Sequence, residues 1–130
     1  MIVGFTGTRE GMTERQKVFF VERLAALGPE QFHFGDDDGS DREAFDLVRI
    51  HYPRCWTVSH PPENDAHRAF CKADEIREPK PYLVRNLAIS VCAEELVAAP
   101  KTLVEEIRSG TWSTVRYARK AGKSVWLLHP

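Results

Sequence analysis

The first 27 residues, MIVGFTGTREGMTERQKVFFVERLAAL (residues 1–27), carry the pattern that decides the fold. Residues 1–5 are apolar and β-prone, residues 6–11 form a polar, glycine-containing break, and residues 13–27 place apolar side chains at helical spacing. Thr13 followed three residues later by Gln16 matches a capping box, so a helix is expected to begin there. This stretch predicts a strand, a loop and an amphipathic helix.

The same succession repeats along the chain. Short apolar runs predict further strands over residues 32–34, 55–58, 95–99 and 124–128. Helical spacing predicts helices over residues 39–50, 82–92 and 110–122, and a loop with one short helix is expected over 61–81. Alternating strands and helices favour a parallel sheet covered on both faces. The predicted fold class is α/β: a Rossmann-like three-layer sandwich around a central, mostly parallel sheet of about five strands.

Length and charge limit the alternatives. A chain of 130 residues predicts one domain over residues 1–130, and a net charge of −1 provides no basic field to attract nucleic acid. Three widely spaced cysteines without a Cys-x-x-Cys pair indicate free thiols in a reducing compartment and act as small apolar fillers. The chain shows no signal peptide and no membrane span, so we expect a cytoplasmic protein without a membrane partner.

In such a sheet, ligands bind beyond the carboxyl ends of the strands, near the point where strand order reverses. The loops expected there are residues 6–11, 35–41, 60–65 and 100–111. In the last of these, Ser109, Gly110 and Thr111 open a predicted helix. A helix start has unpaired N–H groups and a partial positive charge, which suits a phosphate; the simpler alternative is an ordinary N-cap.

The loop after the first strand contains Gly7, Thr8 and Arg9, where a guanidinium could grip a phosphate or merely lie on the surface. The loop after the second strand runs from Gly35 to Asp41 and includes Gly39 and Ser40 at a helix start. Its acidic run could hold a cation or ribose hydroxyls, or simply favour the helix dipole.

Three further side chains are candidates on the later helices. Arg85 and Asn86 lie early in a predicted helix, where they would point toward the cleft or be solvated. Trp112 directly follows Thr111 and could stack on a base, or pack in the core. We expect no metal site: His60, Asp65 and His67 have suitable chemistry, but Pro61-Pro62 and their spacing favour a loop surface. No cofactor is expected.

These motifs together resemble those of the SMF/DprA-LOG (SLOG) superfamily of Rossmann-like nucleotide-binding domains, in particular its small stand-alone members. Gly7-Thr8-Arg9 stands where the family usually has Gly-Ser-Arg, and residues 35–44 match its Gly-x-x-x-Gly-x-Asp-x-x-Ala run. Arg85-Asn86 matches an Arg-Asn or Arg-Lys pair, and Gly110-Thr111 matches the family's Gly-Thr helix. The resemblance covers nearly the whole chain. It implies a bound nucleotide or nucleotide-derived ligand, with phosphate on the Gly110-Thr111 helix and Arg9, Ser40, Asp41 and Arg85 lining the pocket.

One departure concerns catalysis. Cytokinin-activating phosphoribohydrolases of this family have a Pro-Gly-Gly-x-Gly-Thr-x-x-Glu motif, and Thr114 stands at the position of its glutamate. Threonine cannot replace a carboxylate as general base, so we expect a binding protein rather than an enzyme. The alternative is a nucleoside 5'-phosphate N-glycosidase that uses another acid. The candidates for that acid are Asp41, Glu105, Glu10 and Asp36.

Two expectations concern partners. DprA-type relatives hold single-stranded DNA, and a DNA-linked role is a further alternative, although the near-neutral charge argues against nucleic acid as a partner. Relatives commonly pair through helices beside the cleft, which implies a homo-oligomer. Residues 19–21 are three adjacent apolar residues, more than a helix can bury on one face, so at least one of them is left for contact with a second chain.

Overall fold

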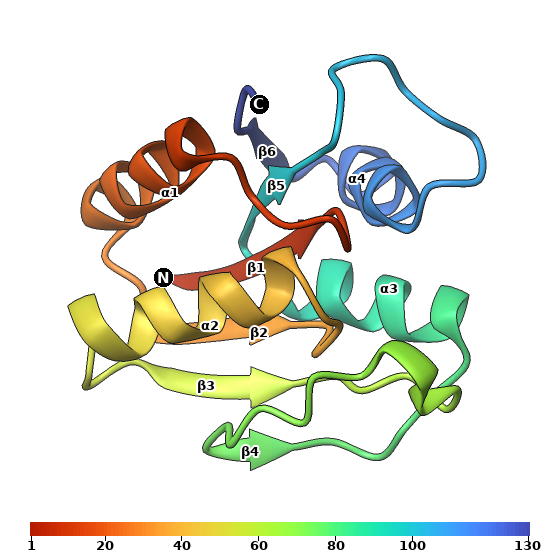
Figure 1. Cartoon of the computed structure of the whole chain (residues 1–130), viewed down its shortest axis with the longest axis horizontal. Coiled ribbons are helices and arrows are strands. Elements are labelled where there is room, and N and C mark those ends of the chain that lie inside the picture. Colours follow the sequence, from red (N-terminus) through yellow and green to blue (C-terminus); the bar gives the residue numbers. More distant parts are fainter.

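The computed structural model describes all 130 residues and shows six strands and four α-helices (Figure 1). The strands are β1 (Ile2–Gly7), β2 (Gln31–Phe34), β3 (Trp56–Ser59), β4 (Glu75–Ile76), β5 (Glu95–Ala99) and β6 (Ser124–Leu127). The helices are α1 (Glu14–Leu27), α2 (Ser40–His51), α3 (Tyr82–Cys92) and α4 (Gly110–Lys120), with a 3₁₀ turn η1 (Asp65–His67).

All five strand pairs are parallel, in the order β4-β3-β2-β1-β5-β6. The chain builds outward from β1 to β4, then crosses back through α3 to place β5 on the other side of β1. Strand order therefore reverses between β1 and β5, where Gly7 pairs with Ala99 at the carboxyl ends. The predicted α/β fold is confirmed. Its sixth strand, β4, lies where we expected only a loop and a short helix, because two residues are too short to show a strand pattern.

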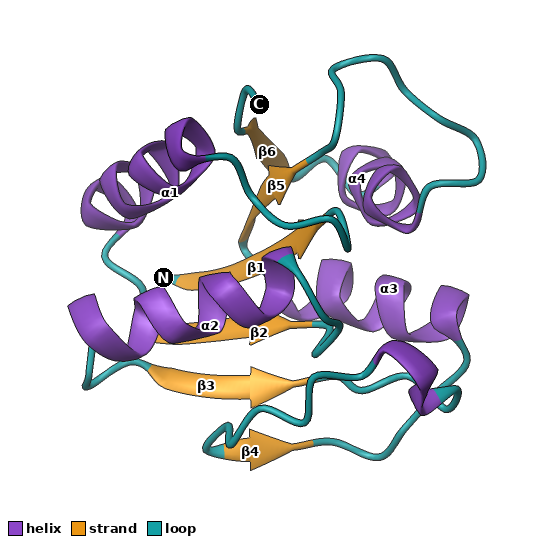
Figure 2. Cartoon of the chain, viewed as in Figure 1, coloured by secondary structure: helices purple, strands orange, loops and turns teal.

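Helices cover both faces of the sheet, which gives three layers (Figure 2). Two hydrophobic cores hold these layers together. On one face, α1 and α2 cover a cluster in which Phe5, Phe20 and Phe32 are fully buried, with ring centroids 5.3–6.1 Å apart. On the other face, α3 and α4 pack on β5 through a smaller core that includes Leu96 and Trp112. Because both faces are covered, the central strands are apolar on both sides, as the sequence pattern suggested.

The predicted capping box at the start of α1 is present. The Thr13 side chain accepts a hydrogen bond from the Gln16 amide, and the Gln16 side chain accepts one from the Thr13 amide, both at 3.0 Å. Gln16 also donates from Nε2 to the carbonyls of Pro100 (2.9 Å) and Leu128 (3.0 Å), so this buried side chain ties α1 to the ends of β5 and β6.

Replacing Thr13 with alanine is expected to lower the free energy of unfolding by about 1 kcal/mol, because the Gln16 amide loses its cap. Urea denaturation followed by circular dichroism measures the change. Thr102→Ala, at an exposed threonine outside any helix, is the matched control and should leave the midpoint unchanged. Equal midpoints for T13A and wild type would contradict a stabilising role for the box.

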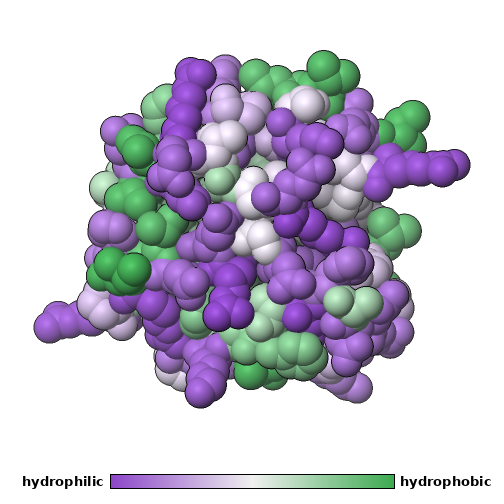
Figure 3. Space-filling model, in the orientation of Figure 1, coloured by the Kyte–Doolittle hydropathy of each residue, from purple (hydrophilic) through white to green (hydrophobic).

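The surface shows which apolar residues the core leaves uncovered. Phe20 belongs to the larger core, and Phe19 and Val21 pack at its margin, so the apolar excess at 19–21 is smaller than expected and oligomerisation stays a prediction. In Figure 3 apolar atoms gather at the upper edge, over the segment between β5 and α4, where Val104 and Ile107 are 74% and 88% exposed.

None of the helices combines the length and apolar character that crossing a membrane requires.

Candidate functional site

A cleft of about 600 Å³ opens at the carboxyl ends of β1 and β5, where the topology predicts a ligand. Its walls come from the loop after β1, the first turns of α3 and the segment leading into α4. The predicted site residues that line it are Gly7, Thr8, Arg9, Gly35, Asp41, Arg85, Asn86, Ser109, Gly110, Thr111 and Trp112. The structure thus brings together residues from all four predicted motifs.

The start of α4 forms one wall of this cleft. Ser109 caps the helix by accepting a hydrogen bond from the Trp112 amide at 3.3 Å. The amides of Gly110 and Thr111 are the first two of the helix and have no acceptor within it. Gly110 is exposed, and a Cβ there would find no atom closer than Asn86 Nδ2 at 4.0 Å. The N-terminal amides are accordingly open to a ligand from the cleft.

Positive side chains line the same cleft as this helix start. Lys101 is paired with Glu10 at 3.0 Å, and Arg116 lies 3.9 Å from Glu105. Arg9 and Arg108 also line the cleft, and neither forms an ion pair. The Arg9 guanidinium instead lies over the Tyr82 ring, 5.3 Å from its centroid. Two guanidiniums without an ion-pair partner, in the same cleft as free helix amides, favour an anion there.

Arg85 is buried and holds the cleft floor together. Its Nη1 donates to the carbonyl oxygens of Gly35 and His60, and its Nε donates to Asn86 Oδ1 at 2.8 Å. Its Nη2 donates to Asp37 Oδ2 at 3.1 Å. Four of the five guanidinium N–H groups are therefore used within the protein, so Arg85 chiefly joins the loops that follow β2 and β3.

Two glycines permit this packing. A Cβ on Gly35 would lie 2.6 Å from Arg85 Nη1 and 2.9 Å from Asp41 Oδ2, so only glycine lets both groups approach the end of β2. Gly39 has φ +80°, and a Cβ there would overlap the Arg9 carbonyl. The loop after β1 thus packs directly on the start of α2.

Ser40 and Gly39 occupy a different place from the one expected. Neither lines the cleft, and Ser40 is fully buried. The Ser40 hydroxyl donates to the Thr8 carbonyl at 2.6 Å, and its amide donates to the same oxygen at 3.1 Å. Ser40 therefore positions the loop that carries Arg9 instead of lying open to a ligand.

Three neighbouring acids have different environments. Asp36 is fully buried and paired with Arg68 at 3.0 Å, and Asp37 is paired with Arg85. Asp41 is 5% exposed and forms no ion pair, and its Oδ2 accepts a hydrogen bond from the Asp37 amide at 3.1 Å. Burial, together with the nearby Asp37 carboxylate, raises the pKa of Asp41 to about 7. Burial also raises the pKa of Asp37.

Among the four predicted acid candidates, Asp41 and Glu10 line the cleft. Glu10 is exposed and paired with Lys101, whereas Asp41 combines burial with a perturbed pKa, the usual combination in a general acid or base. Glu105 is exposed and lies outside the cleft lining, and Asp36 is closed off by its own partners.

The comparisons with known proteins concern the fold. No family model and no curated protein matches the chain. Among solved structures, DNA processing protein A from Helicobacter pylori, described for its single-stranded DNA binding mode, matches with a TM-score of 0.67 and 18% identity. That match covers 98% of this chain and 64% of the other. The chain shares the fold of the matched part of DNA processing protein A. The structure of TM1055, a structural genomics target, matches with the same TM-score and 17% identity over 95% of this chain and 71% of that one.

Both solved structures share the fold of this chain, which is the Rossmann-like fold that the resemblance to the SLOG superfamily implies. Within this DprA-like fold, two residues of α4 face inward. Thr114 is fully buried, and its hydroxyl donates to the Gly110 carbonyl at 3.1 Å, away from the cleft lining. Trp112 is 3% exposed and packs in the smaller core, so its ring has no free face for a base.

Sequence reasoning missed Tyr82, Lys101 and Arg108, all of which line the cleft. Tyr82 is the first residue of α3, half-buried, with guanidiniums 5.3 Å from its ring centroid on both Arg9 and Arg85. An aromatic residue three positions before the Arg85-Asn86 pair was a usable signal, because it lies one helical turn away.

Proposed function

We propose that this chain binds a nucleotide or a nucleotide-derived phosphorylated ligand in the cleft, with phosphate at the start of α4. The observation that carries the proposal is the arrangement there: the free amides of Gly110 and Thr111 open into a 600 Å³ cleft beside Arg9 and Arg108, which have no ion-pair partner. Helix amides and forked guanidinium donors are the groups that proteins use for phosphate.

The rest of the cleft suits a small organic group attached to the phosphate. Its volume falls in the range of small-molecule sites, and Tyr82, at the start of α3, offers an aromatic ring in its lining. In the free protein the Arg9 guanidinium occupies one side of that ring. Movement of Arg9 from the ring to the phosphate would free the ring for a base, so one side chain would couple both contacts.

A thermal-shift and mass-spectrometric screen against nucleoside monophosphates, NAD-derived nucleotides and cyclic nucleotides tests the proposal. Arg9→Ala is expected to weaken the best ligand roughly 10- to 100-fold, the usual effect of losing a charge-assisted hydrogen bond. Gly110→Ala should weaken it too, by crowding the helix amides, while leaving stability unchanged because its Cβ has space.

Arg42→Ala is the matched control, because Arg42 is exposed on α2 and does not line the cleft. It should bind as wild type does. The proposal fails if no nucleotide stabilises the protein, or if R9A and G110A both bind with wild-type affinity.

The environment of Asp41 favours a second candidate function, hydrolysis of the N-glycosidic bond of a nucleoside 5'-phosphate. A buried carboxyl with a pKa near 7 in the cleft wall could protonate the leaving base or stabilise positive charge on the sugar. Release of free base beyond one equivalent, lost in Asp41→Asn with binding retained, would establish this activity. Intact ligand after prolonged incubation would leave binding as the function. Fluorescence anisotropy with a single-stranded oligonucleotide tests the DNA-linked alternative in the same series.

A further inference from the structure

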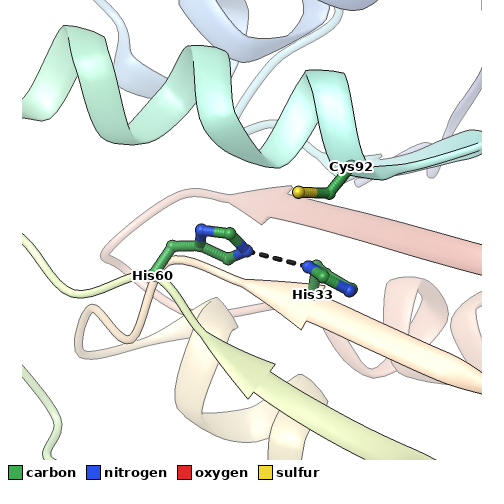
Figure 4. A group of neighbouring side chains, drawn as sticks. All are labelled: His33, His60 and Cys92. Carbon is green, nitrogen blue, oxygen red and sulfur yellow. Dashed lines mark hydrogen bonds between the residues drawn. The ribbon is translucent and has the colours of Figure 1, made fainter. Parts of the chain in front are cut away.

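A second group of reactive side chains lies apart from the cleft, on the face of the sheet covered by α3. His33 lies on β2, His60 directly follows β3, and Cys92 is the last residue of α3. Figure 4 shows the three side chains pointing toward one another, and their nitrogen and sulfur atoms lie within 4.8 Å of one another. None of the three lines the cleft assigned above.

The two histidines already form a defined pair. His33 Nδ1 and His60 Nε2 lie 2.8 Å apart, and His33 Nε2 lies 3.0 Å from Gln31 Oε1. Because the Gln31 oxygen can only accept, the His33 proton belongs on Nε2, and His33 Nδ1 accepts the hydrogen bond that His60 Nε2 donates. A partner that orients a histidine in this way is typical of the outer shell of metal sites.

Both imidazoles are buried, with His33 2% and His60 4% exposed. With its proton on Nε2, His33 can offer the Nδ1 lone pair to a metal without losing a proton. A shift of the His60 proton from Nε2 to Nδ1 would free the second lone pair without changing the net charge.

Cys92 supplies the third ligand and differs from the other cysteines. It is half-buried, and its sulfur accepts a hydrogen bond from Arg77 Nη1 at 3.4 Å, which places a positive charge beside it. Arg77 is itself paired with Glu75 at 2.9 Å. Cys55 and Cys71 are buried in the larger core, where burial raises the pKa of each thiol, and they face no histidine.

A second cavity of about 450 Å³ borders this cluster and is lined by His60, Glu75 and Arg77. Three ligands from separate elements beside an open cavity resemble a zinc site that keeps its fourth position for water or another small ligand. At a tetrahedral Zn²⁺ the ligand atoms lie roughly 3.3–3.8 Å apart, so a small rotation of Cys92 and of the histidine rings would suffice.

We propose that His33, His60 and Cys92 bind one thiophilic transition-metal cation of the Zn²⁺ type. Two imidazoles and a thiolate select zinc, cobalt or copper over magnesium and calcium. The site ties the ends of β2, β3 and α3 together and presents the metal to the second cavity.

Titration of the metal-free protein with Co²⁺, followed by competition with Zn²⁺, tests this site. We expect one equivalent of Co²⁺ to bind with a thiolate-to-cobalt charge-transfer band in the near ultraviolet, and native mass spectrometry to show one Zn²⁺ per chain. Cys92→Ser should remove that band and weaken Co²⁺ binding at least roughly 100-fold, because the thiolate is lost.

His67→Asn is the control, since His67 is exposed on η1 and outside the cluster, and it should bind Co²⁺ as wild type does. Circular dichroism of the metal-free variants checks that each is folded; should C92S unfold, His33→Asn takes its place in the titration. The proposal is overturned if wild type binds no stoichiometric Co²⁺ or Zn²⁺, or if the folded ligand variant keeps wild-type affinity. It does not depend on the nucleotide cleft, so the two tests can fail separately.

Discussion

Replacing Arg85 with alanine is expected to lower the free energy of unfolding by roughly 3 to 5 kcal/mol, the usual cost of removing one partner of a buried ion pair. Arg85 is 5% exposed and is paired with Asp37, whose side chain is 13% exposed. Without the guanidinium, the Asp37 carboxylate would stay buried without its ion-pair partner. The carbonyls of Gly35 and His60 would also lose their donor.

Urea denaturation measures this loss, with Arg42→Ala, at an exposed arginine on α2, as the control that should shift the midpoint little. The double variant Arg85→Met/Asp37→Asn removes both charges of the ion pair. Comparing it with R85A therefore distinguishes the loss of the ion pair from the cost of leaving the Asp37 carboxylate unpaired. We expect it to be more stable than R85A alone, because no unpaired carboxylate remains. An R85A protein as stable as R42A, or a double variant less stable than R85A, would contradict this account of the cleft floor.

The fold was largely predictable because it depends on local patterns repeated in order. The helix at Tyr82–Cys92 and the strand at Glu95–Ala99 have the expected bounds, and the capping box that Thr13 forms at the start of α1 is present. The alternation of strands and helices predicts that the strands run parallel. Because ligands bind beyond the carboxyl ends of parallel strands, the loops at those ends are the ones expected to form the cleft. By contrast, β4 is held mainly by its pairing with β3, which local pattern does not reveal.

Roles within the loops were harder to predict, because they depend on contacts between distant residues. A serine after glycine at a helix start has the same sequence whether it faces a ligand or, like Ser40, donates to a carbonyl 32 residues away. Arg85 and Asp37 are separated by 48 residues, and His33 and His60 by 27. Only the tertiary structure brings such partners together.

Replacing Asp41 with asparagine is expected to stabilise the protein by roughly 2 to 4 kcal/mol above pH 7, because asparagine carries no charge that must be buried. Asp36 and Asp37 each form an ion pair with an arginine, whereas Asp41 forms none and is almost fully buried, so Arg85 offsets only part of the effect of burial on its pKa. Asparagine keeps an oxygen that can accept the Asp37 amide and removes the charge.

The sign of the pH dependence follows from the raised pKa. Between the ordinary value of 3.8 and about 7, the folded state binds more protons at Asp41 than the unfolded state does. Wild-type stability is therefore expected to fall as pH rises through this window, relative to D41N, and the two proteins should be about equally stable near pH 4. Urea denaturation at intervals from pH 4 to pH 8 measures the difference.

Asp38→Asn is the matched control, because Asp38 is a neighbouring but exposed acid; it should follow wild type at every pH. A D41N protein less stable than wild type at pH 8 would show that the charge of Asp41 is compensated in the folded state. If D41N is the more stable protein, the cleft holds a carboxyl that destabilises the fold at neutral pH. A destabilising residue in a binding cleft is expected to have a role in function. Loss of nucleotide binding or of base release in D41N would show that Asp41 has such a role.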